Sequence, residues 1–326
     1  MKLLITGCAG FIGFHLAQKL LSEKNQVVGV DTVNNYYDPR LKLARVKLLK
    51  KNRYFNFKKI DISDQKELNK IFKKYKFDQV INLAAFAGVE YSLKHPEKYI
   101  NTNEIGFFNI LEAVKKYKIP KLLYASSSTV YGLNKLPFDE TQRTDGPISL
   151  YGATKKNNEI LAYYYSSQFN IETFGIRFFT VYGPYGRPDL SIFKFCRQII
   201  KNETVTLHNY GNNYRDFTYI ADVVDSLLKI IKIKKKKFNK KYKCFYNLIN
   251  IASGRKIKMT KLLKLIEKNI GKKAKVRLGK KLSTDIPASL SYSRVLRNTI
   301  KVKTKTSIED GIKFFVDWYL SYYKSK

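Results

Sequence analysis

Short apolar runs alternate with longer mixed segments along the first half of this chain. Buried β-strands are predicted by the apolar runs at 2–6, 27–31, 54–60, 79–84, 121–126 and 172–178. Helices are predicted between them at 14–22, 65–75 and 101–117, and in a segment that carries Tyr151 and continues to Gln168. Strands that alternate with helices indicate an α/β fold with a doubly wound parallel sheet, Rossmann-like in type.

The pattern becomes less regular after about residue 180, where Pro184, Pro188 and several glycines mark loops. Helices are still predicted at 220–231 and 258–270. The sequence Ser-Ile-Glu-Asp at 307–310 resembles a capping box that opens a last helix at 308–322. We therefore expect a dinucleotide-binding region with the catalytic residues at 1–180. A smaller C-terminal α/β region at 181–326 is expected mainly to bind substrate, with some segments returning to the first region.

A glycine-rich loop, Thr-Gly-Cys-Ala-Gly-Phe-Ile-Gly at 6–13, follows the first predicted strand. Glycines there permit a tight turn and let the backbone approach a pyrophosphate at a helix N-terminus. Asp31 ends the second predicted strand, where a carboxylate can either bond the ribose 2′-hydroxyl or cap a turn. Because a carboxylate would repel a 2′-phosphate, we predict NAD rather than NADP as the cofactor. The residues expected to contact it include Gly7, Gly10, Phe11, Ile12, Gly13, Asp31, Asp61, Ile62, Leu83, Ala84 and Ala85.

The segment Tyr151-Gly-Ala-Thr-Lys155 follows the hydroxyl run Ser126-Ser127-Ser128-Thr129. A phenol and an ammonium at this spacing share one face of a helix. A nearby cation favours the phenolate, so we expect Lys155 to lower the pKa of Tyr151 from about 10. Beside a dinucleotide, a base that takes a hydroxyl proton implies hydride transfer to a nicotinamide. Tyr-x-x-x-Lys is weak evidence alone in a chain with 24 tyrosines, and its order after the glycine loop and the hydroxyl run makes it specific.

The chain contains 62 basic and 26 acidic residues, a formal net charge of +36. Such a charge is compatible with an anionic partner, such as nucleic acid or a membrane surface, or with a lysine-rich residue usage alone. The lysines are spread along the chain and no nucleic-acid motif accompanies them, so we expect no nucleic-acid partner. The densest run, at 232–243, is expected to be a solvated loop.

No segment stays apolar over about 18 residues, so we expect no membrane insertion. The first apolar run breaks at Thr6-Gly7, which fits a strand and loop better than a signal peptide. Cys8, Cys196 and Cys244 have no metal-binding spacing. We therefore expect no metal site, and reduced thiols in a cytoplasmic protein.

The glycine spacing together with Tyr-x-x-x-Lys resembles the extended short-chain dehydrogenase/reductase family over nearly the whole chain. Within that family the chain looks like the nucleotide-sugar epimerases, most closely the UDP-glucuronate 4-epimerases. The resemblance is carried by the segments 29–42, 87–92, 177–189 and 209–219.

The resemblance implies a catalytic triad of Ser127, Tyr151 and Lys155, and a structural or proton-relay role for Asn103 near Lys155 at the cofactor site. It implies that Arg187 and Arg215 meet the diphosphate, which suits a guanidinium because its planar fork donates two parallel hydrogen bonds. It also implies a homodimer formed through the helix at 101–117 and the helix that carries Tyr151.

We therefore expect an NAD-dependent 4-epimerase that converts UDP-glucuronate to UDP-galacturonate through a transient 4-keto sugar. A 4-keto uronate is a β-keto acid that loses carbon dioxide readily, so its carboxylate must be anchored without helping it to leave. Ser128, Thr129 and Thr180 are the candidate anchors, and local backbone bonding is their alternative role. The related decarboxylases place a Glu within the hydroxyl run and the related 4,6-dehydratases an Asp-Glu pair, whereas residues 127–132 contain no carboxylate.

Three positions depart from the pattern of the epimerases that the chain resembles. Glu90 stands where they usually have Arg, Ser291-Tyr292 replaces Ala-Asp, and 282–285 replaces a Pro-Gly-Asp segment. The nearest alternative is therefore a UDP-hexose or UDP-N-acetylhexosamine 4-epimerase, although Thr180 stands where neutral-hexose epimerases often carry Asn. Less favoured are a UDP-uronate decarboxylase, a one-way 4-reductase or dehydrogenase, and a non-enzymatic NAD-binding or nucleic-acid-binding protein.

Overall fold

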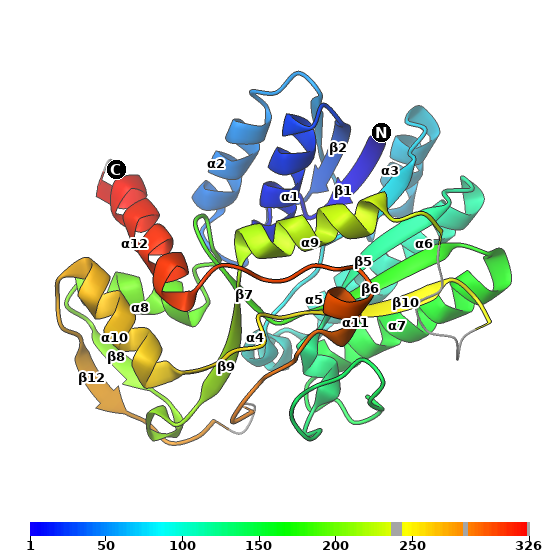
Figure 1. Ribbon diagram of the computed structural model, residues 1–326. Helices are drawn as coiled ribbons and strands as arrows, with labels where there is room; N and C mark the ends of the chain where they lie inside the picture. Colours follow the sequence, from blue (N-terminus) through cyan, green and yellow to red (C-terminus); the bar gives the residue numbers. More distant parts are fainter. Residues whose placement is uncertain (236–242, 283–285, 325–326) are drawn as a thin grey trace.

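The computed structural model describes residues 1–235, 243–282 and 286–324, and a seven-stranded sheet lies at its centre (Figure 1). Every pairing in this sheet is parallel, and the strand order is β10-β6-β5-β4-β1-β2-β3. The chain starts at β1 and winds outward in both directions, which confirms the predicted doubly wound fold. The strands are β1 (Lys2–Thr6), β2 (Gln26–Asp31), β3 (Phe55–Lys59), β4 (Gln79–Asn82), β5 (Lys121–Ser127), β6 (Glu172–Phe178) and β10 (Tyr246–Ile251).

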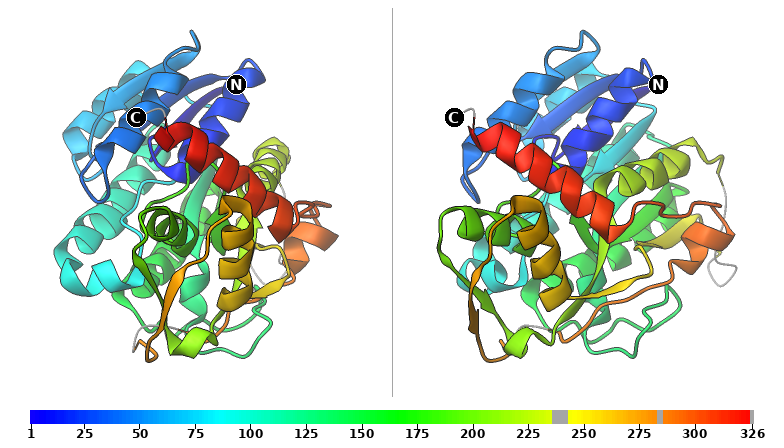
Figure 2. Two further views of the ribbon diagram at one scale, coloured as in Figure 1. Left: turned by 90° about the vertical axis from the view of Figure 1, so that its left-hand side faces the viewer. Right: turned by 60° about the vertical axis from the view of Figure 1, so that its left-hand side comes forward.

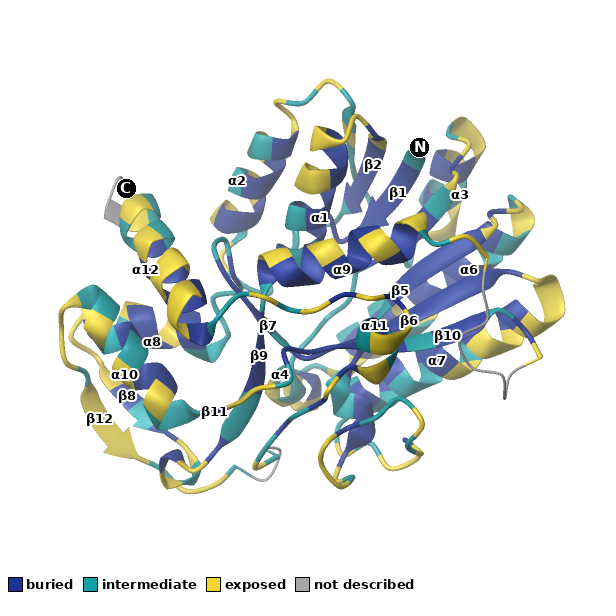
Figure 3. Cartoon of the chain, in the orientation of Figure 1, coloured by how far each residue is buried: buried dark blue, intermediate teal, exposed yellow. Residues whose placement is uncertain are grey.

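Helices cover both faces of the sheet because successive strand residues are apolar on opposite sides. Leu3 and Ile5 belong to the core beneath α1 (Phe11–Ser22) and α9 (Ile220–Lys232). Leu4, between them, belongs to the core on the opposite face. In Figure 3 the strands are dark blue between helices whose outer sides are yellow, as in parallel sheets buried on both faces. The opposite face is covered by α3 (Gln65–Lys74), α6 (Gly106–Lys116) and α7 (Leu150–Phe169).

A third core lies in the smaller part of the chain, around Phe193, Leu262 and Phe315. Segments of this part return to the central sheet: β10 is its edge strand and α9 packs on α1. The end of the last helix also reaches the start of α2 (Pro39–Leu49), where Tyr323 lies near Arg40 (Figure 2). The elements of this part are β7 (Thr180–Tyr182), α8 (Ser191–Ile200), β8 (Thr204–Leu207), β9 (Tyr214–Tyr219), β11 (Lys256–Lys258), α10 (Met259–Ile270), β12 (Lys275–Leu278), α11 (Arg294–Asn298) and α12 (Ile308–Lys324).

The first turns of the helix expected at 101–117 differ from the prediction. Residues Ile100–Ile105 form a π-helix, η1, which α5 (Pro96–Tyr99) precedes and α6 follows. The serine cap of the last helix is confirmed, because the Asp310 N–H donates to Ser307 Oγ at 3.0 Å. The Asp310 carboxylate accepts the Ser307 hydroxyl at 2.6 Å, whereas a capping box would use the Ser307 N–H. Sequence reasoning missed α2 (Pro39–Leu49), α4 (Val89–Lys94), α8 and the short strands after residue 180.

Within the described ranges, no helix combines the length and apolar character needed to cross a bilayer. Of the lysine run at 232–243, Lys232 ends α9, Lys235 donates to Asn170, and residues 236–242 lie outside the described residues.

Candidate active site

A cavity of about 810 Å3 opens at the carboxyl ends of the central strands. Its walls include Gly7 after β1, Asp31 at the end of β2 and Ser127 at the end of β5. This edge of a doubly wound sheet is where such folds bind ligands, and the volume suits one. Of the site residues predicted above, Asn103 does not line it, and those that do are Gly7, Gly10, Phe11, Ile12, Gly13, Asp31, Asp61, Ile62, Leu83, Ala84, Ala85, Ser127, Ser128, Thr129, Tyr151, Lys155, Thr180, Arg187 and Arg215.

The glycine loop after β1 leaves no room for side chains. Gly7 has φ +71°, and a Cβ there would lie 2.7 Å from the backbone of Leu83 and Ala84. A Cβ on Gly13 would lie 2.2 Å from the carbonyl oxygen of Gly7. The bare backbone at the start of α1 therefore faces the cavity, in the arrangement that binds a pyrophosphate. The loop fits the dinucleotide that the sequence predicts.

Asp31 presents a partly buried carboxylate at the end of β2. It accepts hydrogen bonds from the N–H groups of Ala9 at 3.0 Å and Val33 at 2.8 Å. Burial raises its pKa, and the Val33 bond and nearby Lys42 oppose this rise. Lys42 also lines the cavity and donates to the side chain of Asn34 at 2.6 Å, and burial lowers its pKa to about 8. Sequence reasoning did not assign Lys42 to the site, although it lies in the segment 29–42.

Arg45, on α2, is fully buried and fixes the glycine loop from behind. It donates to the Ala9 carbonyl at 2.7 Å and to the Tyr185 carbonyl at 2.6 Å. It therefore joins the loop after β1 to the loop after β7. No motif in the sequence marked this arginine.

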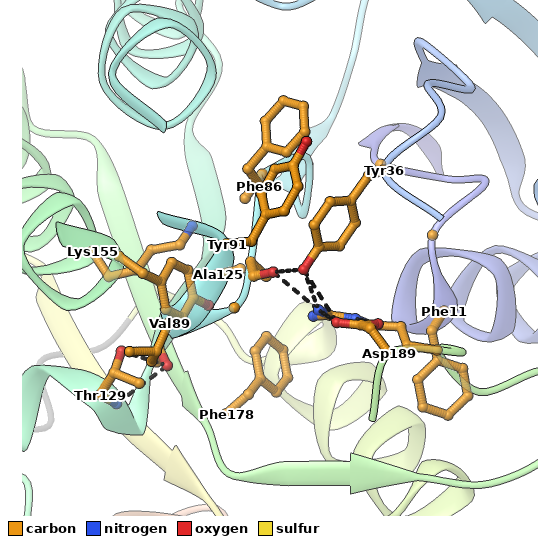
Figure 4. A pocket seen from close by; sticks show the side chains of 18 of the residues that line it. Phe11, Tyr36, Phe86, Val89, Tyr91, Ala125, Thr129, Lys155, Phe178 and Asp189 are labelled. Atoms are coloured by element: carbon orange, nitrogen blue, oxygen red, sulfur yellow. Dashed lines mark hydrogen bonds and ion pairs between the residues drawn. The ribbon is translucent and has the colours of Figure 1, made fainter. Parts of the chain in front are cut away.

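The helix α7 brings Tyr151 and Lys155 to the cavity wall, one turn apart. Ser149 caps this helix by accepting the N–H of Gly152 at 3.1 Å. Burial lowers the pKa of Lys155 to about 8, and the Glu104 carboxylate opposes this change. Figure 4 shows Lys155 at the cavity with Thr129 below it.

The expected effect of Lys155 on Tyr151 is wrong for the protein chain alone. Burial raises the pKa of Tyr151 above its ordinary value, because desolvation penalises the phenolate. The groups that oppose this rise are the Ser127 hydroxyl, by hydrogen bonding, and the Arg187 cation. The four-residue spacing on α7 therefore does not by itself give Tyr151 a lowered pKa.

The hydroxyl run continues from the end of β5 into a 3-10 turn, η2 (Ser128–Tyr131). Ser127 Oγ accepts from the Thr129 N–H at 3.2 Å and from the Thr129 hydroxyl at 2.9 Å. Thr180 lies two residues past β6, the neighbour of β5, and so comes to the same wall. Hydroxyl groups rather than carboxylates surround this end of the cavity. Among the described residues, the acidic ones that line the cavity are Asp31, Asp61, Glu90 and Asp189.

Arg187 joins three loops across the cavity. It donates to Asp189 at 3.0 Å, to the Ala87 carbonyl at 3.0 Å and to the Tyr36 hydroxyl at 3.3 Å. Tyr36 in turn donates to Asp189 at 3.1 Å, and Figure 4 shows the two side chains meeting. Burial opposes the charge of Arg187, but Asp189 and Tyr36 hold its pKa above the usual value. Tyr36 and Asp189 were not predicted as site residues.

Asn103 lies behind the cavity wall, in the π-helix. Its side chain accepts the Phe86 N–H at 2.9 Å, and donates to the Phe86 carbonyl at 3.0 Å and to the Thr154 hydroxyl at 3.1 Å. It therefore ties the loop after β4 to α7. This placement supports a structural role beside Lys155 rather than direct contact with a ligand.

The positions that differ from the pattern of the UDP-glucuronate 4-epimerases lie in different surroundings. Glu90 is exposed and lines the cavity, whereas Tyr292 is 55% exposed and does not line it. Ser291 is buried and accepts from Asn250 at 3.0 Å. Leu282 lines the cavity, and residues 283–285 lie outside the described residues.

Comparison with known proteins adds three findings. Residues 3–248 match the model of the NAD dependent epimerase/dehydratase family. The chain is 42% identical over 335 residues to the protein CapI of Staphylococcus aureus, covering 99% of this chain and 100% of that protein. It is 39% identical to UDP-glucuronate 4-epimerase 4 of Arabidopsis thaliana, covering 99% of this chain and 76% of that protein.

The fold also matches a solved structure over almost its whole length. This is the UDP-glucuronic acid 4-epimerase of Bacillus cereus in complex with UDP-glucuronic acid and NAD. The TM-score is 0.91 at 30% sequence identity, covering 99% of this chain and 100% of that one.

Proposed function

The chain belongs to the NAD-dependent epimerase/dehydratase family, and from this premise we propose that it is a 4-epimerase that interconverts UDP-glucuronate and UDP-galacturonate. One observation carries the choice of reaction: the cavity holds Tyr151 and Lys155 beside a wall of hydroxyl groups with no carboxylate in the run.

NAD is the cofactor of this reaction, and when bound it supplies the acceptor and donor of the hydride at C4 of the sugar. The glycine loop fits its pyrophosphate, because the backbone there leaves space that any Cβ would fill. Asp31 would hold the adenosine ribose, and Asp61 and Ile62 would flank the adenine. The end of β4, with Leu83, Ala84 and Ala85, would complete the cofactor side.

The proposed proton transfer belongs to Tyr151. Its phenolate takes the proton of the sugar 4-hydroxyl as C4 is oxidised, and returns it when C4 is reduced from the opposite face. Ser127 orients the hydroxyl, and Lys155 contributes positive charge beside the base. Arg187 and Arg215 would bind the diphosphate, for which Arg187 exchanges contacts with Asp189.

The uronate carboxylate is assigned to Ser128, Thr129 and Thr180, which line one wall. Hydroxyl donors hold a carboxylate without neutralising it, and no acid stands in the run to assist the loss of carbon dioxide. This arrangement favours reduction of the 4-keto sugar over its decarboxylation.

A neutral UDP-hexose is the second candidate substrate, and Glu90 favours it. An exposed carboxylate at the cavity wall would repel a uronate, whereas the epimerases that the chain resembles usually place Arg there. Because of Glu90, the experiment must test which UDP-sugar is the substrate, rather than whether the reaction is a 4-epimerisation.

Proton NMR of the purified protein with NAD and UDP-glucuronate tests the proposal. We expect UDP-galacturonate to appear without carbon dioxide or accumulated NADH, and Tyr151→Phe to abolish the conversion. Turnover of UDP-glucose or UDP-N-acetylglucosamine instead would keep the mechanism and refute the uronate assignment. UDP-pentose as the main product would show a decarboxylase.

We also infer the division of labour within the chain, its assembly and its location. Residues 1–180 would carry NAD and the catalytic residues, and 181–326 mainly the nucleotide sugar, with α9 and β10 completing the first region. A homodimer is supported by exposed apolar side chains on η1, α6 and α7. Free, buried Cys8, Cys196 and Cys244 support a cytoplasmic location. Because a UDP-sugar is an activated donor of its sugar, we also propose a role in polysaccharide precursor supply.

A further inference from the structure

A buried ion pair lies directly behind the hydroxyl wall of the cavity. Arg177, on β6, donates from Nε and Nη2 to the two carboxylate oxygens of Glu159, on α7, each at 2.8 Å. Both side chains are 2% exposed. Two parallel charge-assisted bonds fix orientation as well as distance between the elements that they join.

The pair reaches the segments to which proton transfer and carboxylate binding are assigned. Glu159 follows Tyr151 and Lys155 on α7 at intervals of four residues, so the three side chains lie along one side of the helix. Glu159 also accepts the Ser126 hydroxyl at 2.6 Å, immediately before Ser127.

The arginine makes the matching contacts on the strand side. Arg177 stands opposite Ser126 in the β5–β6 register, three residues before Thr180. Its guanidinium also lies 4.7 Å from the ring centre of Tyr131, which belongs with Ser128 and Thr129 to the turn η2. One ion pair thus links the helix of the base to the hydroxyl run and to the strand that leads to Thr180.

A gain in folding stability does not by itself explain why a buried ion pair stands at this place. The desolvation of two buried charges offsets most of their attraction, and well-packed apolar residues often do as well. The ion pair and its bond to Ser126 fix the distance of α7 from β6 and β5 more sharply than apolar packing would, because these hydrogen bonds are directional.

We propose that Glu159 and Arg177 are positioning residues that set Tyr151 against the carboxylate-binding hydroxyls and so keep the 4-keto uronate from losing carbon dioxide. This inference rests on the proposed function. In the competing reaction the C5–C6 bond breaks, its electron pair forms an enolate with the C4 carbonyl, and carbon dioxide leaves. A proton then adds at C5 and gives a UDP-4-keto-pentose. Its release would leave one NADH for each molecule formed, and return of the hydride to C4 would give a UDP-pentose. A carboxylate turned out of its hydroxyl anchors would enter this path.

The same two strands provide a matched control. Lys121 and Glu172 form a second buried pair at the opposite end of β5 and β6, where they are directly paired, at 3.4 Å and with side chains 5% and 4% exposed. Neither lines the cavity. Glu159→Gln and Glu172→Gln therefore each remove a buried carboxylate that pairs with a cation on β5 or β6, but only the first does so behind the site.

The experiment compares kcat, KM, carbon dioxide release and melting temperature for these two variants with UDP-glucuronate. We expect both to melt at lower temperature. Glu159→Gln should lower kcat by about 100-fold, as for a small misplacement of reacting groups, with little change in KM and with UDP-4-keto-pentose among the products. Glu172→Gln should keep the kcat and the product ratio of the native enzyme.

Equal kcat and product ratios in the two variants would overturn the proposal, because the pair would then be structural only. If Glu159→Gln does not fold, Ser126→Ala decides, since it removes the hydroxyl through which β5 bonds Glu159 at 2.6 Å, a single hydroxyl at the edge of the cavity lining. It should shift the product ratio in the same direction, and an unchanged ratio would also overturn the proposal. If the native enzyme converts only a neutral UDP-hexose, the uronate assignment and the decarboxylation readout fail together. The kcat comparison with that hexose still tests the positioning.

Discussion

Asp31 makes the clearest single-residue prediction, because its carboxylate carries the choice between two cofactors. Asp31→Asn keeps the shape and removes the charge that would repel a 2′-phosphate. We expect NAD to bind about tenfold more weakly, since a hydrogen bond to a charged group is worth about 1.5–3 kcal/mol, and NADP to bind more tightly than to the native protein. Calorimetric titration of cofactor-stripped protein measures both affinities. An unchanged NAD/NADP ratio would assign Asp31 to turn capping alone.

Lys155 gives a pH dependence whose direction follows from burial. Its pKa in the folded protein is lowered from 10.5 to about 8. Between these values the unfolded chain binds more protons than the folded one, so the stability of the folded protein rises with pH. We expect the native protein to gain about 2 kcal/mol relative to Lys155→Met between pH 8 and pH 10. Urea unfolding of the two cofactor-stripped proteins measures this difference, in which the similar contribution of Lys42 cancels. A constant difference would show that Lys155 keeps its ordinary pKa.

Single site residues were predictable where chemistry demands a residue type at a fixed spacing. Gly7, Gly13, Tyr151 and Lys155 meet that condition. Arg45 does not, because it reaches the glycine loop from α2 through a buried side chain that only folding brings there. The prediction of a lowered pKa for Tyr151 was wrong for a related reason. The spacing shows a neighbouring cation, but the desolvation that raises this pKa depends on the complete fold.

The π-helix η1 makes a prediction about the element that supports the wall of the site. Asn103 satisfies both backbone groups of Phe86, so Asn103→Ala leaves them without these bonds. We expect the free energy of unfolding to fall by about 2–3 kcal/mol, and NAD affinity to fall because the loop after β4 loosens. Asn101→Ala is the control, because Asn101 is exposed on the same π-helix and bonds Ser63 at 3.2 Å. Chemical denaturation that showed equal losses in both variants would contradict this role.

The same segment shows why some elements escaped sequence reasoning. Apolar periodicity indicated a helix at 101–117, but a widened turn shifts the register without changing the residue types. Six of the seven strands of the central sheet were predicted, because most of them are buried on both faces and so form apolar runs, whereas the edge strand β10 was missed. The strands β8 and β12 are short, and all four residues of β12 are exposed, so no such signal marks them.

At the scale of the whole molecule, the less regular second half of the chain supplies elements that complete the central sheet and its helical cover. The edge strand β10 and the covering helix α9 come from beyond residue 180, and α12 reaches back to α2. Unfolding by heat or denaturant should therefore be one cooperative transition rather than two, because the core of the first region beneath α1 is completed by residues of α9 and β10. Circular dichroism and tryptophan fluorescence, which reports on Trp318 in α12, should give the same midpoint. Separate midpoints would show two independent regions.

The proposed dimer concerns the outer surface of the molecule and follows from what that surface leaves exposed. Ile105 and Phe108, on η1 and α6, are 48% and 43% exposed, and Ile160 and Tyr164, one turn apart on α7, are 54% and 52% exposed. Water-facing apolar groups on adjacent helices are costly unless another surface covers them, and a second copy of these two helices would form a four-helix contact.

We expect sedimentation to give about twice the 38.0 kDa chain mass for the native protein, and a single chain mass for Ile160→Glu combined with Tyr164→Glu. Two carboxylates at the centre of such a contact would lose their hydration and repel their copies across the two-fold axis. Phe314→Glu is the control, because Phe314 is 47% exposed on α12, away from these helices, and its loss should leave the dimer intact. A native protein that sediments as one chain at all concentrations, or a double variant that stays dimeric, would exclude α6 and α7 as the contact. Since Tyr151 and Lys155 lie on α7, the dissociated variant should also melt at lower temperature and turn over more slowly, which links assembly to catalysis.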